Sequence, residues 1–201
     1  MRSTEEIRER YERICERVGA GVTVVAATKY VSLEEMGALA EAGIEVAGEN
    51  RAQALAAKQA QYGAAFRWHF IGHLQSRKAP LVSELCELCH SLASESAARQ
   101  LSIPALVEVN LAGEETKSGI APEKLEDFLA FCAQVGVDVR GLMTMPPLTD
   151  DAEDSRPFFR RLRELAGRFS LTQLSMGTSQ DYLVAAEEGA TYVRVGSVLW
   201  S

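Results

Sequence analysis

The sequence lacks several features that mark specialised classes of protein. No apolar run reaches the roughly 20 residues that a membrane-spanning helix needs. Residues 1–18 are strongly charged and do not carry the apolar stretch of a secretory signal. Positive charge is in deficit, with 21 Lys and Arg against 28 Asp and Glu, a net charge of −7 that works against a broad nucleic-acid surface. We therefore expect a cytoplasmic, monomeric protein that binds neither membranes nor nucleic acid.

Cysteine is also scarce, and the four thiols should stay reduced in the cytoplasm. Cys86-Glu-Leu-Cys-His90 matches the sequence motif of a c-type haem attachment site. That chemistry requires export, however, and Cys89 and His90 fall inside a candidate strand. A zinc site would need two further ligands at suitable spacing, and none is evident. We expect structural thiols and no metal.

The remaining composition is that of an ordinary globular protein, with 47% apolar and 24% charged residues in a chain of 201. A chain of this length can bury a sizeable core without disulfides or metals. No Gly/Ser linker or shift in composition divides it. We therefore treat residues 1–201 as a single domain.

Hydrophobic periodicity predicts regular alternation of strands and helices. The expected strands are 22–28, Glu45–Ala47, Arg67–Ile71, Leu88–Ser91, Ala105–Asn110, Val139–Met143, Gln173–Met176 and Tyr192–Val195. The clearest helices are 4–18 (capped by Thr4), 32–42 (capped by Ser32), 122–135, 155–169 and 181–188. Eight strand–helix steps predict an α/β fold, a single (β/α)₈ TIM-type barrel preceded by an N-terminal helix. An open doubly wound sheet is the alternative.

In such a barrel, functional residues gather at the C-terminal ends of the strands. Lys29 directly follows the first strand and shares its parity with Thr23, Val25 and Ala27. If that face points into the barrel, the ammonium is partly desolvated, which favours a nucleophilic amine. A surface lysine in a loop is the alternative interpretation, and position alone does not decide between them.

Two turns near the end of the chain predict a phosphate site. One follows the seventh strand and the other follows the eighth, which are the places where this fold binds phosphate groups. Glycines allow close backbone approach, and hydroxyls and a helix N-terminus favour an anion. The residues concerned are Ser175, Gly177, Thr178, Gly196 and Ser197.

Three further polar residues lie on or just after strands: Asn50, His69 and Arg194. The first two could contact the ring substituents of a ligand, or could be satisfied polar groups in the barrel. An unpaired arginine inside a barrel is costly. Arg194 therefore needs an acidic partner, such as Glu108, or an electron-rich ligand.

Seven segments, in order along nearly the whole chain, resemble the pyridoxal phosphate homeostasis proteins, one-domain relatives of the alanine racemase barrel. They are Ala27-Thr-Lys-Tyr30, Gly48-Glu-Asn-Arg51, Trp68-His-Phe-Ile-Gly-His-Leu-Gln-Ser76, Gly113-Glu-Glu-Thr-Lys-Ser-Gly119, Gly141-Leu-Met-Thr-Met-Pro146, Leu174-Ser-Met-Gly-Thr-Ser179 and Val193-Arg-Val-Gly196. The resemblance implies that pyridoxal 5'-phosphate is held as a Schiff base on Lys29. It places Asn50 and His69 in the cofactor pocket and assigns the two turns to its phosphate.

The resemblance also implies that Arg194 faces the pyridine nitrogen, with a phosphate contact as the other possibility. An arginine there keeps the nitrogen unprotonated and weakens the ring as an electron sink. The racemases add a second domain that supplies a tyrosine base, which this sequence does not show. We expect a carrier of the reactive aldehyde that acts in cofactor homeostasis, without turnover and with apo-enzymes as possible recipients.

Two other functions remain open at this point. A PLP-dependent amino-acid racemase would use the same barrel and lysine, and a class I aldolase would use a barrel lysine on a phosphosugar. Thr116-Lys-Ser118 is similar to the end of a P-loop, but the preceding glycine is absent. Lys117 in that segment is the main competitor of Lys29 for the imine.

Overall fold

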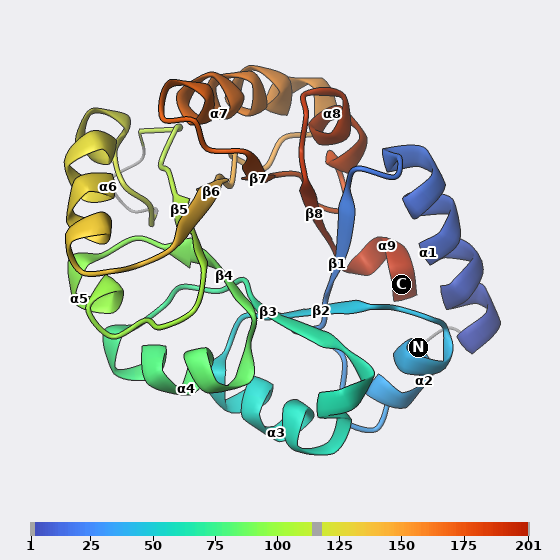
Figure 1. Cartoon of the computed structure of the whole chain (residues 1–201). Coiled ribbons are helices and arrows are strands. Elements are labelled where there is room, and N and C mark those ends of the chain that lie inside the picture. The colour runs from blue at the N-terminus through green and yellow to red at the C-terminus, as the bar shows by residue number, and fades with distance from the viewer. Residues whose placement is uncertain (1–2, 114–117, 201) are drawn as a thin grey trace.

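A closed barrel of eight parallel strands forms the centre of the molecule (Figure 1). The structure is a computed structural model and describes residues 3–113 and 118–200. The strands follow one another in chain order, and β1 closes the ring by pairing with β8. They are β1 (Thr23–Ala27), β2 (Val46–Glu49), β3 (Arg67–Phe70), β4 (Leu88–Leu92), β5 (Ala105–Glu108), β6 (Val139–Met143), β7 (Gln173–Ser175) and β8 (Tyr192–Val195). The barrel expectation is confirmed, and the open sheet is excluded.

Helices surround the barrel on its outer face (Figure 1). They are α1 (Thr4–Val18), α2 (Met36–Glu41), α3 (Ala52–Tyr62), α4 (Ala79–Leu85), α5 (Glu95–Ala98), α6 (Leu125–Gln134), α7 (Arg156–Arg168), α8 (Tyr182–Glu187) and α9 (Ser197–Trp200). Short 3₁₀ turns lie at Gly63–Ala65, Ser76–Lys78, Pro122–Lys124 and Ala152–Ser155. Within residues 3–113 and 118–200, no helix is both long enough and apolar enough to cross a bilayer.

The capping residue of the first helix and the first residue of the second helix differ from the expectation. The cap of α1 is Ser3 and not Thr4, because the Ser3 hydroxyl accepts the N–H of Glu6 while the Glu6 carboxylate accepts the N–H of Ser3. Ser32 and Glu35 make the same reciprocal pair, but the chain passes through turns before α2 begins at Met36. The capping motif therefore predicted this turn correctly. It predicted the start of the helix four residues too early.

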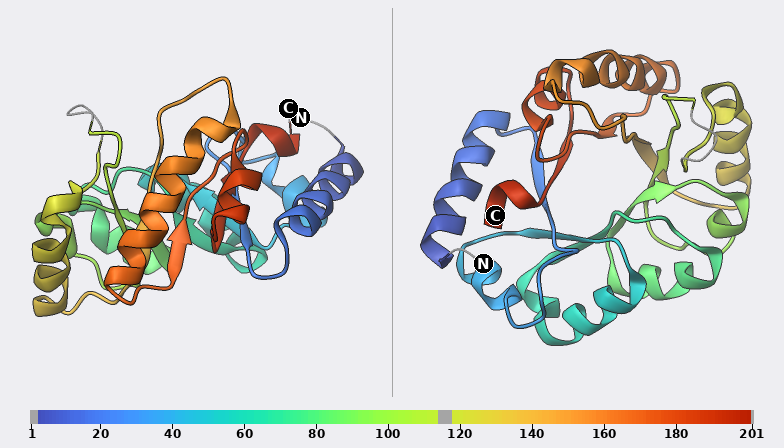
Figure 2. Two further views of the ribbon diagram at one scale, coloured as in Figure 1. Left: turned by 90° about the horizontal axis from the view of Figure 1, so that it is seen from above. Right: turned by 180° about the vertical axis from the view of Figure 1, so that it is seen from behind.

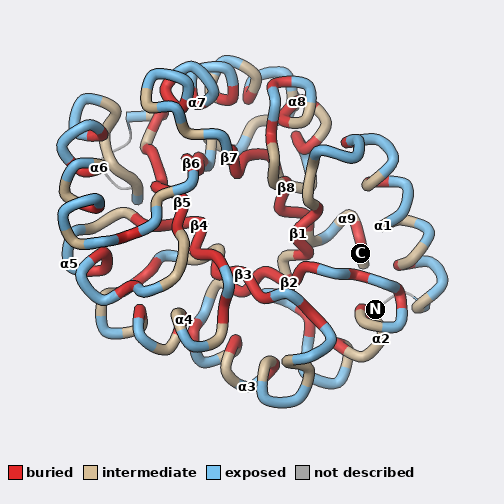
Figure 3. The backbone as a smooth tube through the Cα atoms, in the orientation of Figure 1, coloured by how far each residue is buried: buried red, intermediate tan, exposed pale blue. Residues whose placement is uncertain are grey.

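Alternation along the strands separates two apolar layers. Outward residues such as Val24 and Ala26 pack with the helices in the main core. Inward residues form a smaller cluster of Leu88, Leu106 and Met143, against which Tyr192 packs. Figure 3 shows the buried backbone concentrated in the strands and on the inner sides of the helices. The inward positions of β1 therefore include Val25 and Ala27, which sets the direction of the residues that follow.

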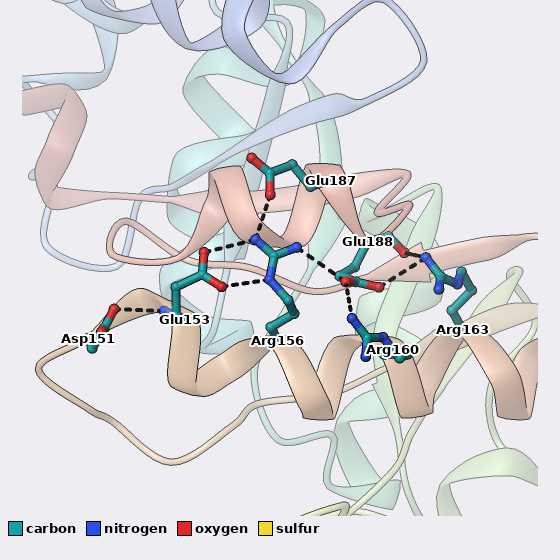
Figure 4. Close-up of polar contacts among 7 residues, drawn as sticks. All are labelled: Asp151, Glu153, Arg156, Arg160, Arg163, Glu187 and Glu188. Carbon is teal, nitrogen blue, oxygen red and sulfur yellow. Dashed lines mark hydrogen bonds and ion pairs between the residues drawn. The ribbon is translucent and has the colours of Figure 1, made fainter.

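A network of ion pairs ties α7 to the end of α8 (Figure 4). The buried carboxylate of Glu188 lies 3.2 Å from Arg156, 3.2 Å from Arg160 and 3.0 Å from Arg163. Arg156 also binds Glu153 at 2.6 Å. One acid shared by three arginines on successive turns orients two helices that flank the seventh strand. The network thus holds α7 and α8 together beside the loops on that side of the barrel.

Candidate functional site

A cavity of about 820 Å³ opens at the C-terminal ends of the strands. This is within the roughly 300–1,000 Å³ range of small-molecule pockets. Figure 2 shows the loop after β6 and helix α9 at the same end of the barrel. Six of the nine expected site residues line this cavity: Lys29, Asn50, Thr178, Arg194, Gly196 and Ser197. The structure thus brings together residues that lie up to 168 positions apart in the chain.

Lys29 enters the cavity from the inward side of β1, as its parity predicts. It is exposed, however, and its Nζ lies 4.9 Å from the centre of the Tyr30 ring. The expected desolvation of the ammonium is therefore wrong for the protein alone. The reason is that Lys29 lies two residues beyond the last residue of β1, where the barrel is already open.

Asn50 is held at the wall of the cavity by tight backbone packing. A Cβ atom at Gly72 would lie 2.1 Å from the Asn50 carbonyl oxygen, so only glycine fits there. The hydroxyl of Ser91 donates in turn to the Gly72 carbonyl. Gly72, which follows β3, thus positions Asn50, which follows β2.

Behind Lys29 and Asn50 lies a buried group of three residues, which we call the Glu49 cluster: Thr28, Glu49 and Lys58. Lys58 Nζ lies 2.5 Å from Glu49 Oε1 and 2.7 Å from the Thr28 carbonyl oxygen. The Thr28 hydroxyl donates to the same carboxylate at 2.9 Å, and the Asn50 N–H donates to it at 3.0 Å. The cluster joins the ends of β1 and β2 to α3. Sequence reasoning missed the cluster because Lys58 belongs to no motif and pairs with Glu49 only when α3 packs against the barrel.

The turn after β7 is shaped by internal contacts. Gly177 has φ +88°, and a Cβ there would lie 2.5 Å from the Ala185 Cβ, so this glycine serves the packing of α8. The Thr178 N–H and hydroxyl both donate to the Asp181 carboxylate, at 2.6 and 3.1 Å. Gly177 does not line the cavity, whereas Thr178 does. The positive φ and the contact with α8 give Gly177 a structural role, and its expected approach to an anion stays a prediction.

The turn after β8 contacts the turn after β7 at one side of the cavity. The Ser179 hydroxyl accepts the Gly196 N–H at 3.0 Å, and both residues line the cavity together with Ser197. Ser197 begins α9. Hydroxyl groups from two loops therefore gather at one side of the cavity, and Asp181 behind them already accepts the N–H and hydroxyl of Thr178.

Arg194 lies on the floor of the cavity and is buried. It donates to the Ser175 hydroxyl at 2.5 Å and to the Thr144 carbonyl at 3.1 Å. Burial lowers the pKa of Arg194 to about 10. Of the two alternatives considered for Arg194, the ion pair with Glu108 is not formed within the described residues, where Glu108 accepts the Ser118 hydroxyl at 2.6 Å.

Two expected site residues lie below the cavity, inside the barrel. Ser175 is fully buried between Arg194 and His90 Nδ1, which is 2.8 Å away, so it is not available to a phosphate group. His69 is also buried and contacts His90 at 2.9 Å. Burial lowers the pKa of His69 to about 4 and lowers that of His90 well below its ordinary value. Both rings are neutral at neutral pH.

Several cavity residues carry no polar motif and were missed by sequence reasoning. They are mainly apolar and come from the loops after β1, β3, β6 and β8: Tyr30, Ile71, Met145, Leu148 and Trp200. Tyr30 and Leu148 are 84% and 83% exposed, which is unusual for large apolar side chains. The mouth of the cavity thus has an apolar rim. Lys117, the competitor of Lys29, lies outside the described residues.

A closed barrel of eight parallel strands with outer helices is the architecture that this chain shares with the alanine racemase N-terminal domain. That family matches residues 3–201. Alanine racemase from Clostridium difficile superposes with a TM-score of 0.78 over 97% of this chain and 56% of its own, at 12% identity, which shows the shared fold alone.

More similar proteins narrow the class. The pyridoxal phosphate homeostasis protein of Aquifex aeolicus is 39% identical, covering 96% of this chain and 93% of the relative. PipY of Synechococcus elongatus, solved with PLP bound, has a TM-score of 0.87 at 31% identity and covers 97% of this chain and 100% of its own. The chain belongs to the pyridoxal phosphate homeostasis protein family.

Proposed function

We propose that this protein binds pyridoxal 5'-phosphate and holds its aldehyde as a Schiff base on Lys29. The observation that carries the proposal is the placement of Lys29 in one cavity with Asn50, Arg194 and the hydroxyls of two turns. The cavity is large enough for a ligand of this size, and its single described lysine is Lys29. An amine beside polar and apolar walls suits an aldehyde on an aromatic ring.

The phosphate would lie against the turns after β7 and β8. Thr178, Ser179 and Ser197 offer hydroxyls there, and α9 begins at Ser197. Gly196 is part of this surface, although its N–H already donates to Ser179. Ser175 and Gly177, which the resemblance also suggested, support this surface from behind. Loops after the seventh and eighth strands are the usual phosphate site of this fold.

Arg194 would face the pyridine nitrogen from the cavity floor. The bound cofactor supplies an electron sink for amino-acid chemistry, and a guanidinium at its nitrogen weakens that property. We therefore propose cofactor homeostasis without turnover, in which the protein buffers the reactive aldehyde. The names of the relatives support this function over a racemase.

Release of the cofactor to apo-enzymes belongs to the same proposal. The cavity opens to solvent beside the exposed Tyr30 and Leu148, so a receiving protein has direct access to its mouth. The described cysteines are all unpaired, as expected in the cytoplasm. We propose a cytoplasmic monomer whose cofactor site needs no second subunit.

Borohydride reduction tests the site. The protein is mixed with pyridoxal 5'-phosphate, reduced and digested, and the labelled peptide is sequenced. We expect the label on Lys29 and its loss in Lys29→Arg, because arginine keeps the charge but forms no stable imine. A label on Lys117 would overturn the assignment. Lys78→Arg, a change at a lysine away from the cavity, serves as the matched control.

A racemisation assay tests the absence of turnover. The protein loaded with pyridoxal 5'-phosphate is incubated with single enantiomers of several amino acids, and optical rotation is followed. We expect no change beyond that of free cofactor, because Arg194 disfavours a carbanion on the ring. Racemisation that disappears in Lys29→Ala would make the protein an enzyme.

A further inference from the structure

A continuous row of polar contacts crosses the interior of the barrel below the cavity. We call it the relay; it consists of Arg194, Ser175, His90, His69 and Glu87. The successive distances are 2.5 Å from Arg194 Nη1 to Ser175 Oγ, 2.8 Å on to His90 Nδ1, 2.9 Å from His90 Nε2 to His69 Nδ1, and 3.0 Å from His69 Nε2 to Glu87 Oε1. The row starts in the cavity and ends just before β4, at the other end of the barrel.

The chemistry of the two ends fixes the direction of every hydrogen bond. A guanidinium only donates, so the Ser175 oxygen accepts from Arg194 and its own proton goes to His90 Nδ1. His90 then carries its proton on Nε2 and donates to His69 Nδ1. His69 likewise carries its proton on Nε2 and donates to the carboxylate, which only accepts. Each group uses its donor and acceptor once, and both rings are neutral, as their burial requires.

The relay adds to the electrostatic compensation of Arg194 in the barrel. A buried cation needs a counter-charge, and the charges of Glu108 and Asp181 favour the charged form of Arg194 without an ion pair to it among the described residues. Glu87, at the half-exposed end of the relay, is connected to Arg194 through three neutral groups and also binds Arg67 at 2.7 Å. Hydrogen bonds arranged in one direction polarise one another, so the charge of Glu87 strengthens the hold of Ser175 on Arg194. A layer of branched apolar residues is the usual filling at this place, so the polar row calls for a specific reason.

We propose that His90 and His69 are positioning residues for Arg194, which transmit the charge of Glu87 through the barrel and fix the guanidinium toward the ring nitrogen of a bound heteroaromatic ligand. This inference rests on the proposed function, since the ligand is the pyridine ring of pyridoxal 5'-phosphate. It assigns a ligand-related role to residues at the end of the barrel opposite the site. It also predicts that changes there reach the cofactor.

The first experiment needs no cofactor and examines the relay itself. The full chain is labelled with ¹⁵N in its three histidines, and the ring nitrogens are assigned by NMR. We expect the Nε2–H form in both His69 and His90, and we expect Glu87→Gln to shift the His90 signals although Glu87 does not touch that ring. A proton on Nδ1 of either ring, or a response that stops at His69, would overturn the relay.

The second experiment adds pyridoxal 5'-phosphate and measures its affinity and its absorption band. His90→Phe keeps an aromatic ring but removes both nitrogens, and we expect about tenfold weaker binding and a displaced band, as for loss of one charge-assisted hydrogen bond. Leu106→Ala is the matched control, because it disturbs the same interior without touching the relay. We expect it to lower stability while the band stays in place.

The results separate this inference from the proposed function. If the wild-type protein does not bind the cofactor, the proposed function fails, and the NMR experiment still decides whether the relay exists. If binding occurs and His90→Phe behaves like Leu106→Ala, the positioning role is refuted. Should His90→Phe fail to fold, Glu87→Gln replaces it, since outside the relay this half-exposed side chain loses only its surface ion pair with Arg67. A displaced band in Glu87→Gln supports the inference, and an unchanged band overturns it.

Discussion

Two buried cations support opposite sides of the cavity, and they are compensated in different ways. Behind Lys29, between the barrel wall and α3, Lys58 contacts its acid directly at 2.5 Å. Inside the barrel, the hydrogen bonds of Arg194 within the described residues go to neutral groups, while Glu108 and Asp181 act on it without contact and Glu87 lies four hydrogen bonds away. The first arrangement neutralises a charge where it lies. The second keeps the guanidinium directed toward the cavity without a carboxylate in contact with it.

The difference follows from what each cation is near. Lys58 faces no ligand, so a carboxylate in contact with it has only a structural effect, which is to join β1, β2 and α3. A carboxylate in contact with Arg194 would compete with any ligand acceptor in the cavity. The comparison therefore predicts that damage to the Glu49 cluster chiefly lowers stability. Damage to the β7–β8 side should affect stability less and ligand binding more.

The largest expected effect concerns the Glu49 cluster. Lys58→Met removes the cation, leaves the Glu49 carboxylate buried without its partner, and takes a donor from the Thr28 carbonyl. Removing one member of a buried ion pair costs about 3–5 kcal/mol. We expect a loss of that size in the free energy of unfolding, measured with urea at pH 7.5.

The double variant Glu49→Gln/Lys58→Met is the control for this change. It removes both charges, so much of the lost stability should return. A single Lys58→Met variant as stable as the wild type would show that the cluster does not hold the two strands to α3.

The second effect is a loss of stability in acid that arises from the relay. Burial lowers the pKa of His69 to about 4, whereas an unfolded histidine has a pKa near 6.5. Below pH 6.5 the unfolded chain binds more protons than the folded chain, so the free energy of unfolding falls as pH falls toward 4. The contribution of His69 amounts to roughly 3 kcal/mol across this window, and His90 acts in the same direction.

Urea unfolding at pH 7.5, 6, 5 and 4.5 measures this dependence. His69→Phe is less stable at pH 7.5 but has one proton-binding site fewer, so it should lose less than the wild type between pH 7.5 and 4.5. An equal loss in both proteins would mean that acid acts on other groups, and that the relay rings are not held neutral.

The smallest effect separates the two glycines of the phosphate-side turns. Gly177→Ala forces a side chain onto φ +88° and against Ala185, and we expect a loss of roughly 2 kcal/mol. In Gly196→Ala the nearest atom to the new Cβ is 3.4 Å away, and the stability should change by less than about 1 kcal/mol. Thermal unfolding of the two variants side by side checks the difference. Equal losses would contradict a structural role confined to Gly177.

The barrel was predictable from the sequence because each strand–helix step carries a local signal. Strands 139–143 and 192–195 and helix 4–18 were predicted at their observed bounds. The alternation of side chains along β1 correctly predicted that Lys29 lies on the side of the cavity. Local signals were weaker for helix beginnings, where turns intervene between a capping pair and its helix, as at Ser32 and Met36.

The sequence by itself determined the class of fold and the strand ends at which Lys29, Asn50 and Arg194 lie, because side-chain alternation and turn residues are local properties. Only the tertiary structure decided that Ser175 and His69 lie beneath the cavity, that Arg194 is connected to Glu87 through a row of neutral groups, and that Lys58 pairs with Glu49. These contacts join residues 9 to 85 positions apart. Their partners are chosen by the closure of the barrel and the docking of α3, which no local pattern encodes.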